Sequence, residues 1–442
     1  MSDTLIVLLD NAVAGAVTRL RGGRLRFEYD DNYGARPSTL PMSLATTPGA
    51  TPLSLSMPLQ IRSHTDQVVT PWLWNLLPDN EAVLARWARQ FHASTSSPFS
   101  LLATPVGEDC AGAVQFVTPE NVQEVMGRRG EVTWLTEGEV AQRLRELRED
   151  STAWLGQSFT GQFSLAGAQA KTALLYQDGR WGVPHGSAAT SHILKPAVAG
   201  FDDHDLNEHL CLDAARRAGL IVARTRVASF EDQTAIVVDR YDRRVADGRM
   251  VRIHQEDLCQ ALGLPPWKKY QNEGGPGAKD ITGLLRRVMV PSVGDAAVSR
   301  FADALIWNWI IAGTDAHAKN YSVLLAPDQV RLAPLYDIAS ALPYGVHERE
   351  LKFAMKIGGD YRVFPYRDTW PAAARDLGVD PDALEARARQ LALAAPDAFS
   401  DAAAAPDITD LGRGLPQKLV DLVAERAARC VKLLTAPATL GL

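Results

Sequence analysis

The octapeptide GTDAHAKN, residues 313–320, places Asp315, His317, Lys319 and Asn320 within six positions, directly after the apolar run ADALIWNWIIA. A carboxylate can accept a proton, an amide oxygen can bind a hard cation such as Mg2+, and an imidazole or ammonium can lie against negative charge. A helix that ends in a polar turn explains the glycine and threonine of this stretch. It does not explain why these four side chains occur together.

Phosphoryl transfer needs a held nucleotide, a placed Mg2+ and an oriented acceptor hydroxyl. The spacing from Asp315 to Asn320 is that of the aspartate and asparagine in the catalytic loop of protein kinases. We expect Asp315 to accept the hydroxyl proton, Asn320 to bind Mg2+, and Lys319 or His317 to lie against the γ-phosphate. A second metal carboxylate should follow on the next strand or turn, and RLAPLYDIAS supplies Asp337. Each aspartate alone reads as a capping or turn residue, but the ordered set favours catalysis.

The nucleotide half should lie upstream, where SLAGAQAKTAL forms a loop of small residues between two strand-like pieces. The loop is not a Walker A motif, because Ala170 stands where the glycine before Lys171 should be, and it is not GxGxxG. A tight turn explains it equally well. The candidate phosphate-loop residues are Leu165, Ala166, Gly167, Ala168, Gln169, Ala170 and Lys171.

Lys195, in the apolar strand HILKP, is costly to bury unless it is paired. Glu208 in the following helix is its natural partner, and such a pair grips the α- and β-phosphates in kinases. The alternative is a surface lysine beside a proline. IVVDRYD falls where a hinge between lobes is expected, so Asp239, Arg240 and Tyr241 are candidates for the adenine site. A strand end followed by a turn explains that stretch equally well.

Hydrophobic periodicity predicts the elements that position these residues. The first half is β-rich with helices, and the second is helical with short strands, which is the order of a two-lobed kinase. We therefore predict an α+β fold with domains at 1–125, 126–245 and 246–442. Strands are expected at 4–11, 15–33, 162–181, 192–196, 234–241, 322–326 and 330–337; helices at 76–91, 136–147, 203–219, 254–263, 281–289, 299–313 and 416–434, with an alanine-rich helix and linker at 388–407.

The composition limits which classes of protein this chain can belong to. The chain has 442 residues, 46% hydrophobic and 22% charged, as in ordinary globular proteins with more than one subdomain. The net charge of −6 argues against a large nucleic-acid surface, so any DNA contact should come through a partner. The four scattered cysteines (Cys110, Cys211, Cys259, Cys430) fit buried thiols in a reducing compartment. The N-terminus has no signal-peptide pattern, and we expect a cytoplasmic protein.

Several motifs together resemble the HipA family of bacterial serine/threonine kinases, the toxins of HipBA-type modules. They are SLAGAQAKTALL, HILKP, NEHLC, VVDRYDR, HQEDLCQALG, GTDAHAKNYS and LAPLYDIAS, and FEYDDNY, LSLSMPL and LLPDNE resemble the family's N-terminal domain. The resemblance implies a HipA-like, distantly kinase-like fold that uses ATP and Mg2+. It implies a helix-turn-helix DNA-binding antitoxin as partner and an aminoacyl-tRNA synthetase as substrate, so that translation and growth stop and cells persist.

Carried onto this chain, the resemblance makes Asp315 the catalytic base, Asn320 and Asp337 the Mg2+ ligands, and Lys195 the phosphate lysine. It assigns 165–171 to the phosphate loop. Ala170 departs from the glutamate found there in the best-known members. The resemblance also points to Ser164 as an autophosphorylated serine. Phosphate there would repel the phosphates of ATP and compete for the loop's N–H groups. Without the resemblance, Ser164 reads as a strand residue facing solvent.

Three other functions fit parts of the pattern. A small-molecule kinase of the aminoglycoside type shares the Asp-to-Asn spacing and predicts an acidic substrate pocket in the helical lobe and no neighbouring antitoxin gene. A pseudokinase-like binding module is disfavoured because Lys195, Asp315, Asn320 and Asp337 are all present. A metal hydrolase would need a second histidine near His317 at ligand spacing, and none is there.

Overall fold

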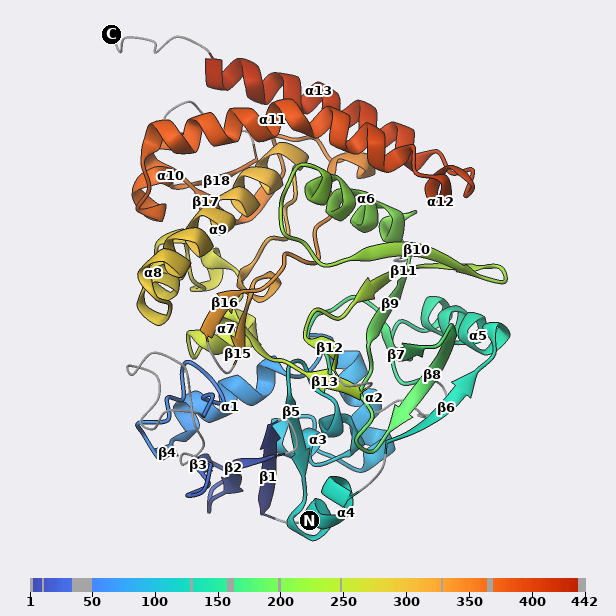
Figure 1. Cartoon of the computed structure of the whole chain (residues 1–442), viewed down its shortest axis with the longest axis vertical. Helices are drawn as coiled ribbons and strands as arrows, with labels where there is room; N and C mark the ends of the chain where they lie inside the picture. Colours follow the sequence, from blue (N-terminus) through green and yellow to red (C-terminus); the bar gives the residue numbers. More distant parts are fainter. Residues whose placement is uncertain are drawn as a thin grey trace.

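The computed structural model describes residues 3–9, 12–33, 50–127, 130–156, 163–197, 200–246, 249–326, 329–363 and 369–435. The first described strand, β1 (Thr4–Leu9), lies near the bottom of Figure 1, and the last described helix, α13 (Leu415–Thr435), lies at the top. The Ser-, Thr- and Pro-rich residues 36–58 read from the sequence as a loop with short strands, and GRRGE at 127–131 reads as a turn; part of each lies outside the described residues. In the described part of the chain, no helix is long and apolar enough to cross a membrane.

The N-terminal part is an antiparallel sheet in the order β4-β3-β2-β1-β5. Its strands are β1 (Thr4–Leu9), β2 (Ala12–Arg19), β3 (Leu25–Tyr29), β4 (Ser63–His64) and β5 (Val114–Val117), with helices α1 (Asp66–Asn75), α2 (Glu81–Phe91), α3 (Pro98–Leu102) and α4 (Val122–Gly127). The side chain of Asn80 caps α2 by accepting the N–H groups of Ala82 and Val83. The apolar face of α2 is buried, including Trp87.

The second sheet has the order β10-β11-β9-β7-β8-β6, and its pairs are antiparallel. Its strands are β6 (Glu131–Leu135), β7 (Thr172–Gln177), β8 (Arg180–His185), β9 (His192–Pro196), β10 (Thr225–Phe230) and β11 (Gln233–Asp239). Val237 packs with Val140 and Leu144 of α5 (Glu137–Glu149), whereas Val227 belongs to the cluster that holds Leu206 of α6 (His204–Arg217). The two helices therefore cover opposite faces of the sheet.

The last part is mainly helical and forms the top and left of Figure 1. Its helices are α7 (Leu258–Ala261), α8 (Ala278–Val288), α9 (Pro291–Ile311), α10 (Thr369–Leu377), α11 (Pro381–Ala403), α12 (Pro406–Thr409) and α13 (Leu415–Thr435). A three-stranded sheet lies beneath them, formed by β14 (His254–Asp257), β15 (Ser322–Ala326) and β16 (Gln329–Leu332). Two small hairpins complete it, β12 (Arg243–Ala246) with β13 (Arg249–Arg252) and β17 (Lys352–Ile357) with β18 (Asp360–Arg362).

One local prediction was wrong in this part. The segment 254–263 was predicted as one helix, but His254–Asp257 is strand β14, which pairs with β15. Asp257 then starts α7 through a capping box with Gln260. The alanine-rich segment 388–407, predicted as helix and linker, lies largely in α11, which continues past Pro396 to Ala403. The predicted domain boundaries at 125 and 245 fall inside α4 and β12.

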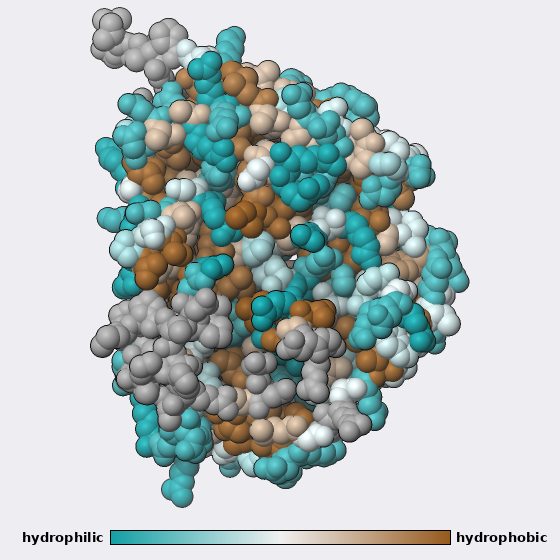
Figure 2. Space-filling model, viewed as in Figure 1, coloured by the Kyte–Doolittle hydropathy of each residue, from teal (hydrophilic) through white to brown (hydrophobic). Residues whose placement is uncertain are grey.

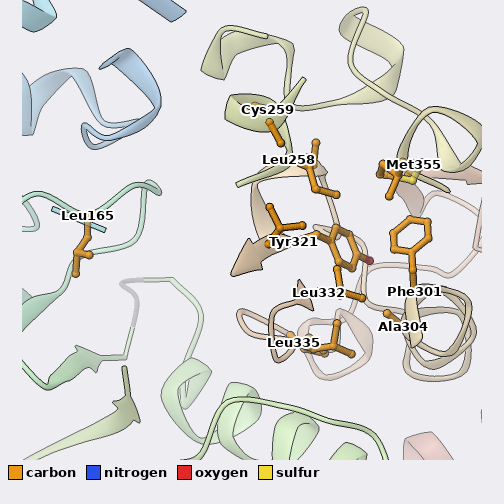
Figure 3. Packing of buried hydrophobic residues seen from close by; sticks show 14 of the residues in the cluster. Leu165, Leu258, Cys259, Phe301, Ala304, Tyr321, Leu332, Leu335 and Met355 are labelled. Carbon is orange, nitrogen blue, oxygen red and sulfur yellow. The ribbon is translucent and has the colours of Figure 1, made fainter. Parts of the chain in front are cut away.

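A large apolar core supports the helical part. Figure 3 shows side chains from α7, α9, β16 and β17 gathered around Tyr321, among them Leu258 and Phe301, while Leu165 lies apart on the side of the second sheet. The rings of Phe301 and Tyr321 meet edge to face at 5.1 Å. Polar residues cover much of the face in Figure 2, with apolar patches between them. The fold is thus α+β with two lobes and a small β-rich N-terminal subdomain, as predicted.

Candidate active site

A cavity of about 620 Å3 lies between the second sheet and the helical lobe. Its lining contains every site residue predicted from the sequence except Ala170 and Ser164. Residues far apart in the chain, such as Lys195, Asp315 and Asp337, therefore share one cavity. The lining also includes residues of the N-terminal subdomain, Asn75 and Asp79.

The loop 313–320 is fixed at both ends. Helix α9 ends at Ala312, which adopts a left-handed conformation with φ 53°. A Cβ atom on Gly313 would lie 2.2 Å from the side-chain oxygen of Asn308, so a larger residue there would require the side chain of Asn308 to move. At the other end, the buried Tyr321 ties the loop to the core. These anchors hold the polar side chains of the loop at the edge of the cavity.

Asp315 presents an exposed carboxylate, with 68% of its side chain accessible. The hydroxyl of Tyr270 donates to its Oδ1 atom at 2.8 Å, and Nε2 of His317 is 4.0 Å from the same oxygen. Burial lowers the pKa of His317, so its imidazole is neutral at pH 7. The side-chain nitrogen of Asn320 donates to the backbone oxygen of Asp315 at 2.8 Å. That bond directs the amide and leaves its oxygen available as a ligand.

Lys319 lies deeper than the sequence suggested. Its side chain is 2% exposed, and Nζ is 3.2 Å from Oδ1 of Asp79 and 3.7 Å from Oδ2 of Asp257. It also donates to Oδ1 of Asn75 at 3.0 Å. The ammonium group of Lys319 is therefore paired with two carboxylates, and Lys319 also lines the cavity. The sequence missed these partners, and Tyr270, because they lie 45 or more positions away and carry no motif of their own.

The predicted pair of Lys195 and Glu208 is present, at 2.8 Å between Nζ and Oε1. Nζ also donates to Oδ1 of Asp337 at 2.7 Å. Burial alone would raise the pKa of Asp337, but Lys195 and Lys171 outweigh burial and hold that pKa well below its usual range. Asp337 is positioned by Leu335, whose backbone pairs with residues 221–223. Its carboxylate is thus ionised beside two lysines.

The predicted phosphate loop, 165–171, crosses the cavity between the two lobes. Nζ of Lys171 donates to the backbone oxygen of Ala166 at 2.7 Å and lies 4.9 Å from the ring centre of Trp154. Burial, and then the charge of Lys195, lower the pKa of Lys171 to about 8. Gly167 has φ 103°, and a Cβ atom there would lie 2.8 Å from that ammonium. The loop thus places Lys171 near Lys195 of β9, where an anion would relieve the repulsion between the two ammonium groups.

Ser164 does not face solvent, so the simplest prediction from its sequence context was wrong. The residue is fully buried, and its hydroxyl donates to the backbone oxygen of Leu76 at 2.8 Å. Its backbone N–H donates to the oxygen of Asp109. A group added to this hydroxyl needs the start of the phosphate loop to move.

At the end of β11, the three hinge candidates differ. The carboxylate of Asp239 lies 3.2 Å from His192, and the ring of Tyr241 packs at 5.7 Å from that of Tyr336. The guanidinium of Arg240 is buried among Asp242, Thr190 and Asp109, so its side chain is committed to the protein interior. Its backbone N–H donates to the oxygen of Ser191 at 2.9 Å and its backbone oxygen accepts the N–H of Arg243 at 3.1 Å, so the backbone groups of Arg240 also have partners within the protein.

The sequence matches two family models, the HipA N-terminal domain over residues 5–117 and the HipA-like C-terminal domain over residues 163–399. The chain belongs to the HipA family. A putative kinase, Y4mE, of Sinorhizobium fredii is 35% identical over 380 residues, covering 85% of this chain and 86% of that protein. The serine/threonine-protein kinase toxin HipA of Shewanella oneidensis is 30% identical over 317 residues, covering 69% and 70%.

The fold agrees with this membership. HipA of S. oneidensis, solved as a complex with HipB and operator DNA, superposes with a TM-score of 0.80 and 23% identity, over 97% of this chain and 98% of that one. The chain is therefore a serine/threonine protein kinase of the HipA toxin family, with the distantly kinase-like fold expected from its motifs.

The side chains that line the cavity have the charges and ligand atoms that Mg2+–ATP requires. Lys195 and Lys171 offer cations for phosphate oxygens, and Asp337 and Asn320 offer oxygen ligands for Mg2+. No group of three or more His, Cys, Asp or Glu side chains in the described residues could hold a metal ion. Mg2+ usually binds one or two carboxylates together with substrate phosphates.

Proposed function

We propose that this HipA-family kinase transfers the γ-phosphoryl group of ATP to a serine or threonine hydroxyl of a protein, with Asp315 as the proton acceptor. The observation that supports it best is the shared cavity. There an exposed, oriented carboxylate faces the same space as the Lys195–Glu208–Asp337 ion pairs. Mg2+, when bound, would supply neutralisation of the phosphate charge.

Each residue then has a defined task. Asp315, oriented by Tyr270, takes the proton as the acceptor oxygen bonds to phosphorus and the bond to the ADP oxygen breaks. Lys195, held by Glu208, binds the α- and β-phosphates, and the 165–171 loop binds phosphate with Lys171. Asn320 and Asp337 hold Mg2+. His317 supports the carboxylate of Asp315, and Asp239 and Tyr241 with the backbone of Arg240 border the adenine.

The proposed biological role is that of the toxin in a type II toxin–antitoxin pair. The partner would be a HipB-like helix-turn-helix protein, since the HipA of S. oneidensis was solved with HipB and its operator. The net charge of −6 fits DNA contact through that partner. The substrate would be an aminoacyl-tRNA synthetase, whose phosphorylation stops translation and growth.

The test compares the wild type with Asp315→Asn, which keeps the shape of the side chain and removes the proton acceptor. Purified proteins are given labelled ATP and a cell lysate, and the labelled proteins are identified. We expect transfer to fall by at least about 100-fold while the fold and ATP binding persist. Expression of the wild type should arrest growth, and the variant should relieve it. Labelling of a small molecule instead of a protein would favour an aminoglycoside-type kinase.

We also propose that Ser164 is autophosphorylated and that its phosphate switches the kinase off. A phosphate carries about −1.5 to −2 charges and cannot occupy the buried position of this hydroxyl, so the loop must leave it. Peptide mapping after incubation with ATP should find phosphate on Ser164 in the wild type and not in Asp315→Asn. A phosphorylated protein that still binds ATP normally would contradict the proposal.

A further inference from the structure

The N-terminal subdomain reaches into the active-site cavity through one short stretch, residues 75–80, called here the bridging segment. It runs from the last residue of α1 to the N-cap of α2. Asn75 and Asp79 from this segment line the cavity that holds Asp315. A contact of this kind makes the subdomain part of the catalytic site, not an appendage to it.

One side of the bridging segment holds the phosphate loop. The backbone N–H of Asp79 donates to the oxygen of Gly167 at 3.0 Å, and the side chain of Asn80 donates to the oxygen of Ala168 at 3.5 Å. The backbone oxygen of Leu76 accepts the hydroxyl of Ser164 at 2.8 Å. Gly167 and Ala168 of the loop, and Ser164 directly before it, are therefore tied to three residues of the bridging segment.

The other side of the segment holds the catalytic loop. Each oxygen of the Asp79 carboxylate pairs with a different lysine, Oδ1 with Lys319 at 3.2 Å and Oδ2 with Lys269 at 2.9 Å. The side chain of Asp79 is 10% exposed and that of Lys319 is 2% exposed. Lys269 precedes Tyr270, which hydrogen-bonds Asp315. Without the carboxylate, two poorly solvated ammonium groups would lose their main counter-charge.

We infer that Asp79 is a positioning residue that sets the phosphate loop and the catalytic loop at a fixed separation. The inference rests on the proposed function of those two loops. Its backbone holds the first loop and its side chain holds the second, so a single residue fixes both halves of the site. Small misplacements between reacting groups lower transfer rates strongly. A purely structural ion pair would instead affect the stability of the whole chain.

Asp79→Asn tests this, because it keeps the backbone hydrogen bond and the side-chain shape but removes the charge. We expect kcat to fall on the order of 10- to 100-fold, with a smaller rise in KM for ATP. Hydrogen exchange without nucleotide should quicken in 315–320, because Lys319 loses its counter-charge, and in 163–171, because its anchors lie on the segment that the two ion pairs hold. Outside these loops and their contacts at 75–80 and 269–270, exchange should stay unchanged. The matched control is Asp303→Asn, which removes a part-buried carboxylate bonded to Arg387 at 2.7 Å outside the cavity lining. It should leave kcat and both loops unchanged.

The outcomes separate this inference from the proposed function. An inactive wild type would refute the proposed kinase function, and hydrogen exchange would still decide on the bridging segment. Wild-type exchange in both loops of Asp79→Asn, or faster exchange spread over the whole chain, would overturn the inference. Should Asp79→Asn not fold, Lys269→Met removes one of the two ammonium partners, and the same local pattern is expected at smaller amplitude. Wild-type exchange in that variant would overturn the inference as well.

Discussion

Asp337 combines two features that constrain what can replace it. Its backbone has φ 58°, a left-handed conformation that asparagine and aspartate tolerate better than alanine. Its carboxylate is bonded to Lys195, so it supplies charge as well as an oxygen ligand. Substitution by alanine would both strain the backbone and remove the carboxylate, so the two effects could not be told apart. Asparagine tolerates the backbone conformation and removes only the negative charge.

We predict that Asp337→Asn lowers the affinity for Mg2+–ATP by at least about tenfold, since the metal loses a charged ligand. Isothermal titration calorimetry with Mg2+–ATP measures this directly. Asp178→Asn is the matched control, because Asp178 also has positive φ, at 52°, but lies in the exposed turn between β7 and β8. Unchanged affinity in Asp337→Asn would refute the assignment of this residue to the metal.

At the scale of single residues, the sequence predicts a contact correctly where burying a charge without a partner would cost free energy. A lysine in an apolar strand requires a counter-charge, and Glu208 supplies it at 2.8 Å. The roles of these side chains in binding nucleotide stay predictions. The sequence could not show that Lys319 pairs with Asp79, because that contact joins residues 240 positions apart. For the same reason it could not show that Ser164 is buried against Leu76.

At the scale of elements, a buried charge network joins the N-terminal subdomain to the hinge. Asp109 accepts Thr190 at 2.7 Å from before β9, Arg243 at 2.9 Å from β12, and Arg252 at 3.2 Å from β13. Arg240, at the end of β11, completes the cluster. Because Asp109 is buried, these arginines hold its pKa well below its usual range despite the opposing effect of burial.

We predict that Asp109→Ala lowers the free energy of unfolding by about 3–5 kcal/mol, because it leaves buried arginines uncompensated. Urea denaturation followed by circular dichroism measures the loss. Asp3→Asn, which breaks an ion pair whose aspartate is 71% exposed, should cost less than about 1 kcal/mol. A similar small loss in Asp109→Ala would mean that the network does not hold these elements together.

Helices were predicted correctly where the residues that start them lie close together in the sequence. The sequence TEGE offers Thr136 and Glu139 as a capping box, and this box starts α5 within the helix predicted at 136–147. Element prediction failed for His254–Asp257, whose residues fit a helix until β15 offers them a partner strand. Pairing with a strand 68 positions away is a tertiary effect, and no window of sequence contains it.

At the scale of the molecule, the two-lobed α+β arrangement followed from the order of strand-rich and helix-rich segments. The contacts that join its parts did not. Glu256 of β14 is one of these. Its side chain is bonded to the hydroxyl of Ser54 at 2.5 Å and the backbone N–H of Leu55 at 2.8 Å, both in the N-terminal subdomain. The subdomain is thus packed onto the rest of the chain through a buried carboxyl group.

Burial raises the pKa of Glu256 from its usual 4.5 to about 8. Between those values the folded chain holds a proton at this position that the unfolded chain releases. Stability due to this group is therefore full below about pH 4.5 and declines as pH rises toward 8, by about 1.4 kcal/mol per pH unit at most. The side chain in Glu256→Gln is neutral at every pH, so this position contributes no pH dependence to the stability of that variant. We predict that, in urea denaturation from pH 4 to pH 9, the free energy of unfolding of the wild type falls relative to that of Glu256→Gln between about pH 5 and 8. Near pH 4 the difference between the two proteins should not change with pH. A difference that stays flat across the whole range would show that folding does not raise the pKa of Glu256.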